Sequence, residues 1–213
     1  VPVLKRGIQT IFPGHVELTS RRRGSIQEVA GIFKMNLEER IARPGVESVQ
    51  SNLIYAAKNF LAALIRRFPP LRGFLTAASN ALRWIFSLRT TFEEAGFCTY
   101  VKMIYAVDSQ GGTINVQVDT TDLAGDGITE VVVMNEQGAH YFDRYQDSSG
   151  TCLRGKEIGC WDKVTAAAAS FVCETHRLAY TLRPMEGATL YRGREAIASR
   201  LAWSGFGYSF PPT

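Results

Sequence analysis

The chain lacks the long uncharged apolar runs with which a helix crosses a bilayer. Its apolar segments between residues 46 and 86 are interrupted by Lys58 and Arg83, and none reaches the roughly 18 uncharged residues that a spanning helix needs. The mean hydropathy of −0.05 also argues against a protein with several spans. With 213 residues, 46% of them hydrophobic, the chain can bury a core as one domain or as two small ones.

Recognisable catalytic motifs are also missing. The sequence contains no Gly-x-Ser-x-Gly, no Gly-rich phosphate loop ending in Lys, no His-Glu-x-x-His and no Gly-x-Gly-x-x-Gly before a helix. The three histidines, His15, His140 and His176, are dispersed. We therefore name no catalytic and no cofactor-binding residues, leave the cofactor open apart from calcium, and favour a protein that is not an enzyme.

Cysteine is confined to the back half of the chain, at Cys98, Cys152, Cys160 and Cys173. The spacings do not match the paired C-x2-C ligands of a zinc site. Four cysteines permit two disulfides with three connectivities, and buried free thiols are the alternative. An oxidised Cys152–Cys160 pair would close a short loop.

Charge is unevenly distributed. Residues 1–95 hold 14 Lys/Arg and 7 Asp/Glu, a net charge of +7, whereas the remainder holds 10 and 13, a net charge of −3. Such asymmetry can indicate nucleic acid, anionic lipid or an acidic partner subunit. We expect other protein subunits and an anionic membrane surface as partners, and no specific nucleic acid.

The chain begins with Val1, and residues 1–20 lack the apolar core of a signal peptide. Removal of a targeting segment and truncation are the two explanations. We expect an organellar protein, associated with a membrane such as that of the mitochondrion, with secretion as the alternative.

Residues 1–24 are predicted to form a basic extended arm. Pro2, Pro13 and Gly14 interrupt the segment, and terminal segments of this kind lie on a partner or stay mobile. The candidate interaction residues of the arm are Arg21, Arg22 and Arg23, with a solvated charge run as the alternative.

Residues 25–95 are predicted to contain three amphipathic helices. The stretch Ser25–Glu28 has the form of a capping box, and the first helix should end near Arg43 because a proline follows. Apolar residues at helical spacing predict a second helix over 46–68 and a third over 71–86.

Arginines alternate with aromatic residues along the second and third of these helices. This composition is typical of helices that lie in a membrane interface, and packing on a partner or on the protein's own sheet is the alternative. The candidate contact residues are Arg66, Arg67 and Trp84.

Residues 96–202 are predicted to be β-rich. The stretches 99–107, 113–118, 129–134 and 139–145 are rich in β-branched and aromatic residues and predict an antiparallel meander. Its first hairpin turn is expected at Asp108–Gly112. Strands are also predicted over 177–182 and 189–192, and a short helix over 195–201. Residues 161–175 suit either a helix or a strand, and we predict a helix.

Residues 203–213 read as an aromatic, glycine-rich tail. An apolar tail is seldom left in water, so we expect it to dock into a groove of its own domain or of a partner. Its candidate contact residues are Trp203, Phe206 and Phe210.

Acidic residues and glycines gather in a loop before an apolar strand, within residues 119–143. Carboxylates fall at Asp122, Asp126 and Glu130, with glycines between them, and hard cations need several oxygen ligands at once. The stretch resembles one blade of an FG-GAP or VCBS-type β-propeller, in which a calcium loop precedes a hydrophobic strand.

The resemblance implies a calcium site formed by Asp122, Asp126, the Ile128 carbonyl and Glu130. One position of the family's pattern is occupied by Ala124, so a ligand is missing, and we expect affinity in the range of roughly 10⁻⁴ to 10⁻³ M. An acidic turn without an ion is the alternative.

These observations predict an α+β fold: an N-terminal arm and three amphipathic helices, then a mainly antiparallel sheet with one or two short helices. The layout resembles that of cone-shaped NTF2-like domains. The function we expect is that of a non-catalytic accessory subunit in a larger, membrane-associated assembly. The alternatives are a domain that binds a small molecule or lipid between helices and sheet, enzymes included, and a weak calcium-binding interaction module.

Overall fold

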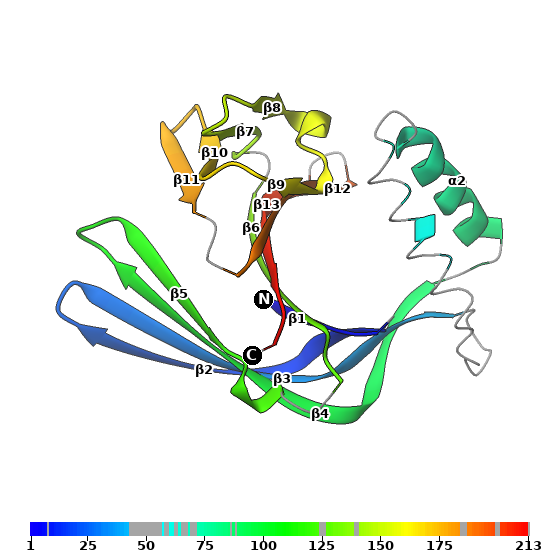
Figure 1. Ribbon diagram of the computed structural model, residues 1–213, viewed down its shortest axis with the longest axis horizontal. Helices are drawn as coiled ribbons and strands as arrows, with labels where there is room; N and C mark the ends of the chain where they lie inside the picture. The colour runs from blue at the N-terminus through cyan, green and yellow to red at the C-terminus, as the bar shows by residue number, and fades with distance from the viewer. Residues whose placement is uncertain are drawn as a thin grey trace. The chain divides into compact units, whose positions relative to one another are not determined.

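The structure is a computed structural model that describes residues 1–7, 9–42, 57, 60–61, 64, 68, 72–85, 87, 89–123, 127–138, 141–183, 187–198 and 201–212 (Figure 1). The chain divides into two compact units. The long-strand unit comprises Pro2–Leu61, Gly73–Glu130 and Pro212–Thr213, and the sandwich unit comprises Val1, Ala62–Arg72 and Val131–Pro211.

The long-strand unit is built on an antiparallel sheet with the strand order β5-β4-β3-β2-β1. Helix α2 (Arg72–Ile85) precedes β4 in the chain, and the 3-10 turn η2 (Thr121–Leu123) follows β5. The strands are β1 (Pro2–Arg6), β2 (Gln9–Arg23), β3 (Ile26–Ala42), β4 (Arg89–Asp108) and β5 (Thr113–Asp119).

Alternation of buried and exposed side chains explains why these segments are strands. On β4, Val101 and Met103 are fully buried while the residues on either side of them are at least partly exposed, as expected when one face of a strand packs on a core. Phe33 and Met35 do the same on the neighbouring β3. The long-strand unit therefore has its core on one face of the sheet.

The sandwich unit consists of two antiparallel layers, β6-β13-β12-β9 and β11-β10-β7-β8. Its core lies between them. The ring centroid of Phe171 in one layer is 4.8 Å from that of Phe206 in the other layer and 5.8 Å from that of Tyr145. The elements are β6 (Glu130–Gly138), β7 (Arg144–Asp147), β8 (Cys152–Arg154), η3 (Gly155–Ile158), β9 (Cys160–Val164), β10 (Ala169–Cys173), β11 (Leu178–Leu182), β12 (Thr189–Ala198) and β13 (Leu201–Phe210).

The predicted α+β fold with three amphipathic helices, and with it the NTF2-like layout, is wrong. Strands account for most of the described residues, and the first predicted helix is strand β3. The second predicted helix, over 46–68, lies largely outside the described residues. The third corresponds to α2.

The first helix was mispredicted because its apolar spacing fits two periods. Val29 and Phe33 are four residues apart, which is close to one helical turn but is also two repeats of a strand. In the structure Ser25 belongs to the turn of the β2–β3 hairpin, beside Gly24 with its φ of 61°. Ser25 is therefore a turn residue and not a helix cap.

Two further predicted helices are strands for a similar reason. Residues 161–175 form β9 and β10 instead of a helix, and residues 195–198 continue β12. Residues 1–24, predicted as an arm, contain β1 and β2, and the predicted tail, residues 203–213, contains residues 203–210 of β13. In each case pairing with another strand, often the next one in the chain, supplies hydrogen bonds that the composition of the segment itself does not report.

The predicted meander is correct only for its first hairpin. β4 pairs with β5, and the turn at Asp108–Gly112 is confirmed by the Asp108–Thr113 pair. β6 instead pairs with β13, while β7 pairs with β8 and β10.

Candidate functional site

Helix α2 turns an apolar face to solvent. Phe74, Ala81 and Ile85 are separated by seven and four residues, so they share one stripe of the helix, and Leu75 to one side is only half-buried. The large exposed side chains of the helix are Phe74 (73%), Leu82 (51%), Trp84 (83%) and Ile85 (62%). A helix that packs on its own core would bury this stripe.

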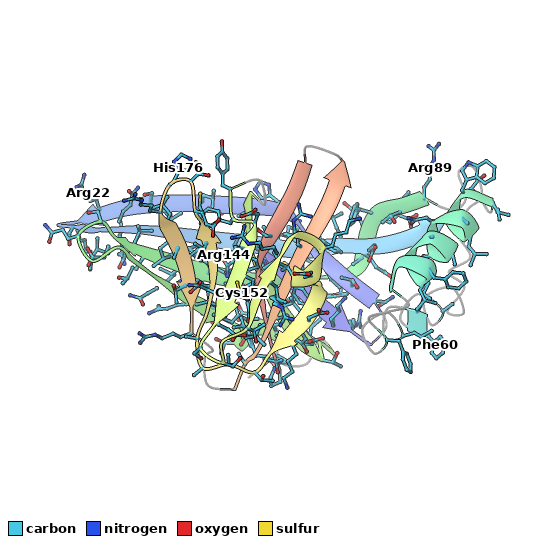
Figure 2. The ribbon with its side chains drawn as sticks, turned by 90° about the horizontal axis from the view of Figure 1, so that it is seen from above. Arg22, Phe60, Arg89, Arg144, Cys152 and His176 are labelled. Atoms are coloured by element: carbon cyan, nitrogen blue, oxygen red, sulfur yellow. The ribbon has the colours of Figure 1, made fainter. Side chains whose placement is uncertain are left out.

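The sequence around α2 is cationic and free of acid. Between Glu47 and Glu93 it contains no Asp or Glu and six Lys or Arg. The six cations are Lys58, Arg66, Arg67, Arg72, Arg83 and Arg89. Phe60 and Arg89, which precede and follow α2 in the chain, are both exposed (Figure 2). Exposed apolar side chains and unopposed cationic charge thus occur in one segment.

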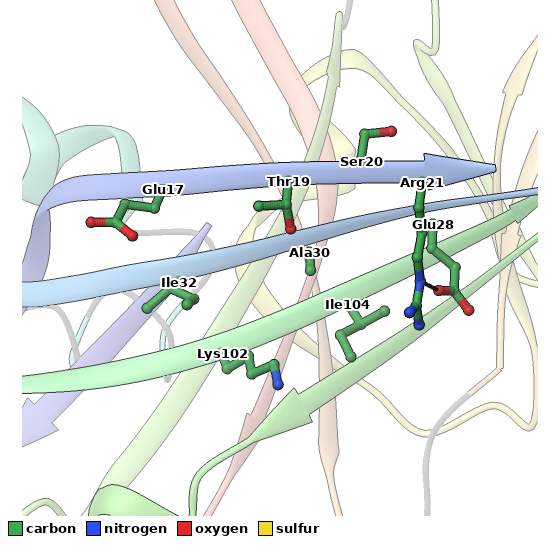
Figure 3. Close-up of a pocket in the computed structure, with 9 residues that line it drawn as sticks. All are labelled: Glu17, Thr19, Ser20, Arg21, Glu28, Ala30, Ile32, Lys102 and Ile104. Atoms are coloured by element: carbon green, nitrogen blue, oxygen red, sulfur yellow. Dashed lines mark hydrogen bonds and ion pairs between the residues drawn. The ribbon is translucent and has the colours of Figure 1, made fainter.

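A groove of about 390 Å³ lies on one face of β2, β3 and β4 (Figure 3). Ala30 lies at its centre, paired with Thr19 on β2 and Ile104 on β4. Because the alanine side chain is small, it leaves the space between its neighbours unfilled. Two acids and two bases line the groove, at Glu17, Glu28, Arg21 and Lys102. Because these charges balance and Arg21 is paired with Glu28, the groove favours neither an anionic nor a cationic ligand.

The turns of the β2–β3 and β4–β5 hairpins are tied together. The amide and the hydroxyl of Ser109 both donate to the carbonyl oxygen of Ser25, at 3.2 and 3.0 Å. Hydrogen bonds from the backbone of Gln110 and Gly111 hold the pKa of Asp108 below its ordinary value. These contacts hold the turn of the β2–β3 hairpin against the turn of the β4–β5 hairpin.

The predicted arginine triplet lies at this end of β2, where all three residues are exposed. Arg21 pairs with Glu28 across the hairpin, and Arg22 Nε donates to the Gly24 carbonyl at 3.2 Å. Arg21 and Arg22 therefore have local partners, and a role in gripping another molecule stays a prediction.

A charged cluster that the sequence did not reveal lies on the β7–β8–β10 layer (Figure 2). Arg144 and Arg154 both donate to Glu174 Oε1, at 2.7 and 2.6 Å, and the Glu174 carboxylate raises the pKa of Arg154. The exposed thiol of Cys152 is on the same strand as Arg154. Arg144 and Arg154 lie 30 and 20 residues from Glu174 in the sequence, so strand pairing brings the charges together, and the cluster clamps the end of β10 to β7 and β8.

The acidic loop is only partly described. The carbonyl oxygen of Asp122 in η2 accepts a hydrogen bond from the Thr99 hydroxyl at 3.4 Å, the Ile128 side chain is buried, and Glu130 begins β6. Asp126 lies outside the described residues. Within those that are described, no three His, Cys, Asp or Glu side chains are grouped so as to hold a metal. The calcium site stays a prediction.

The cysteines differ in exposure. Cys152 is an exposed free thiol, so the predicted Cys152–Cys160 bridge is not formed in this structure. Cys98 is also exposed and free, whereas Cys173 is buried in β10.

The residues predicted to act from the tail belong to β13. Phe206 is 1% exposed and lies at the centre of the sandwich core, so it stabilises the fold and is not available to a partner. Phe210 is half-buried at the end of the strand, and the backbone of Trp203 pairs with Glu195. Arg66 and Arg67 lie outside the described residues, while Trp84 is the most exposed large apolar residue described.

No family model, curated protein or solved structure matches the chain. The likeness of residues 119–143 to a propeller blade accordingly stays a prediction. Across the described parts of the chain, no helix combines the length and the apolar character needed to cross a bilayer.

Proposed function

We propose that this chain is an accessory protein that attaches to an anionic membrane surface through α2 and the cationic segment around it. The observation that carries the proposal is the exposure of large apolar side chains on α2, where Phe74, Trp84 and Ile85 are all more than half exposed. Membership of a larger assembly with other protein subunits, and an organellar location, are part of the same proposal.

The charge of the segment favours lipid over a protein partner. Six cations without any acid between Glu47 and Glu93 match a surface of uniform negative charge. Each Lys or Arg near an anionic leaflet contributes about 1 kcal/mol. A helix of this kind lies in the plane of the interface, with its apolar face among the acyl chains and its polar face towards the headgroups.

The apolar contribution is of comparable size. Fully burying a large aliphatic or aromatic side chain is worth about 1.5–3 kcal/mol, and an interfacial helix recovers part of this for each side chain that enters the acyl region. Phe74, Trp84 and Ile85 together can therefore decide whether the protein partitions onto a membrane.

Vesicle co-sedimentation tests the proposal with the full chain. We expect the protein to pellet with vesicles of phosphatidylcholine and phosphatidylserine, and much less with phosphatidylcholine alone. Raising the salt concentration should weaken the binding, because salt screens the attraction between cations and headgroups.

The decisive variant is Phe74→Ser/Trp84→Ser/Ile85→Ser. Because these side chains are exposed, the thermal midpoint should stay close to that of the wild type, while partitioning onto anionic vesicles should fall at least roughly tenfold. The matched control is Leu178→Ser, an exposed leucine on β11 at 56%, which should leave binding unchanged. Equal pelleting of the triple variant and the wild type, or no pelleting of the wild type with either vesicle, would overturn the proposal.

A further inference from the structure

Strand β5 is an open edge of the long-strand sheet. All seven of its residues pair with β4, from Lys102–Asp119 to Asp108–Thr113, and among the described strands it has no neighbour on its other side. Every residue of β5 is exposed or half-exposed. An edge strand presents unpaired backbone amides and carbonyls, which can pair with another chain.

Most of the features by which proteins protect such an edge are missing from β5. The strand Thr113–Asp119 contains no proline and no lysine, and its pairing with β4 shows no bulge. Its last residue is held in place, because the Asp119 carboxylate accepts a hydrogen bond from the Thr121 amide at 3.1 Å. Hydrogen bonds from Thr121 also hold the pKa of Asp119 below its ordinary value, so the strand carries one fixed negative charge at its end.

The side chains of β5 are sorted by face. Ile114, Val116 and Val118 continue the apolar face of β4, opposite Val107, Tyr105 and Met103. The other face carries Thr113, Asn115, Gln117 and Asp119. Ile114 remains 55% exposed. An added strand must therefore bring apolar residues to the first face and polar residues to the second.

A second copy of β5 meets this requirement. In an antiparallel pair centred on Val116, Ile114 of each copy is opposite Val118 of the other, and Asn115 is opposite Gln117. Each contact occurs twice because such an interface is two-fold symmetric. Opposed apolar residues and opposed amides are both favourable cross-strand pairs.

Charge and register also agree with a second copy. Asp119 faces Thr113, and the two Asp119 residues lie about 20 Å apart across six strand residues, well beyond the screening length of about 8 Å at physiological salt. A shift by one residue would place the apolar face of one copy against the polar face of the other. The centred register is the one that pairs all seven residues.

We infer that the chain forms a dimer in which β5 pairs with β5 of a second copy, joining the two long-strand sheets edge to edge. A strand from a different protein is the alternative partner for this edge. Only a second copy of β5 necessarily has the same length, the same division into an apolar and a polar face, and the same charge. The inference is independent of lipid binding, and its test uses no lipid.

A charge exchange on the two-fold axis tests the dimer. In Val116→Lys the two lysines face each other in the dimer, and in Val116→Glu the two glutamates do, so sedimentation should show that each variant dissociates at least roughly tenfold more readily than the wild type. Mixing the two variants should restore the dimer, because lysine then faces glutamate. The control Leu18→Lys, at an exposed position of β2 away from the edge, should remain dimeric.

Disulfide trapping provides a second measurement that does not depend on the charged variants folding. Residues directly opposite each other in an antiparallel pair have Cα atoms about 4.5–5.5 Å apart, within the range of a disulfide. With Cys98 and Cys152 replaced by serine, Val116→Cys should yield a covalent dimer under mild oxidation, and Gln110→Cys in the adjacent turn should not. A monomeric wild type, a mixture of charge variants that stays monomeric, or a wild type that pairs only with a different protein would each overturn the inference.

Discussion

Gly207 shows how one residue without a side chain can position a large one. The ring of Trp161 lies over Gly207, so that a Cβ at this position would overlap it, and Trp161 is stacked on Tyr191 with the ring centroids 5.1 Å apart. An aromatic side chain that covers a strand glycine compensates for the packing the glycine lacks. The packing of Trp161 on Gly207 therefore explains why β13 tolerates glycine at the centre of a layer.

Gly207→Ala should destabilise the protein by about 1–3 kcal/mol, the usual cost of overpacking. Urea unfolding measures the loss. The control is Gly96→Ala, because Gly96 lies on β4 with nothing near its Cβ position, and it should be close to neutral. In a Trp161→Ala background the Gly207→Ala substitution should cost much less; an unchanged cost would show that Trp161 is not the obstacle.

Asp147 couples the sandwich core to the turn after β7. Its carboxylate accepts hydrogen bonds from the Ser149 and Thr151 amides, at 3.0 and 3.1 Å, and from the hydroxyl of the buried Tyr145 at 2.8 Å. Partial burial raises the pKa of Asp147, but a hydrogen bond from the Ser149 hydroxyl and the three just named outweigh it and hold the pKa below its ordinary value. The charged form is thus favoured by folding.

The stabilisation by Asp147 should depend on pH. A folded pKa below the unfolded value means that the stabilisation is complete above the unfolded pKa, about 3.9, and is lost as the pH falls through the folded pKa. Asp147→Asn should therefore cost about 1–2 kcal/mol at neutral pH and progressively less below about pH 4. Urea unfolding is measured at neutral pH and below about pH 4. The same difference in unfolding free energy between variant and wild type at both would contradict this assignment.

At the scale of elements, spacing decided which predictions were correct. Helix α2 was predictable because its apolar residues, such as Phe74, Leu75 and Ala78, fall at both odd and even positions, which one face of a strand cannot accommodate. In β3 the spacing of Val29 and Phe33 allows both structures. There the pairing with β2 and β4 decided the outcome, and the composition of the segment does not report such pairing.

Strand β13 was mispredicted because of its glycines. Gly205 and Gly207 made the segment look like a tail that docks into a groove, but they alternate with the core residues Phe206 and Tyr208. Alternation of this kind is a strand pattern in which one face carries no side chains. Glycine here provides room for a neighbouring ring, and the sequence alone does not distinguish that use from flexibility.

The exposure of cysteine on each strand predicts the order of thiol labelling. Cys98 on β4 and Cys152 on β8 are exposed, and Cys173 on β10 is 1% exposed. Under native conditions iodoacetamide should modify Cys98 and Cys152 rapidly and Cys173 only after unfolding, because a buried thiol reacts only when the structure opens. Peptide mapping without reductant provides the check. Recovery of a linked Cys152–Cys160 peptide pair would instead support the disulfide predicted from the sequence.

At the scale of the whole molecule, the sequence reveals the composition of the candidate membrane-binding segment but not which face it exposes. The acid-free stretch between Glu47 and Glu93 can be read directly from the sequence. That Phe74 and Trp84 face solvent, rather than a core, depends on the packing of α2 and requires the structure. The open edge of β5 also requires the structure, because it depends on the order of the strands in the sheet.

The division into two units predicts that damage to one core leaves the other strands protected. Phe171 is fully buried and touches Tyr145 and Phe206 within the sandwich unit. Phe171→Ala removes most of a buried ring and should cost about 3–5 kcal/mol. Local cooperative units open separately in native-state hydrogen exchange, so amides of β7, β10 and β13 should exchange faster in the variant, while amides of β3 and β4 keep their wild-type rates. The conservative variant Phe171→Leu should give the same pattern at a smaller amplitude. Parallel acceleration in β3 and β4 would show that the two units unfold as one.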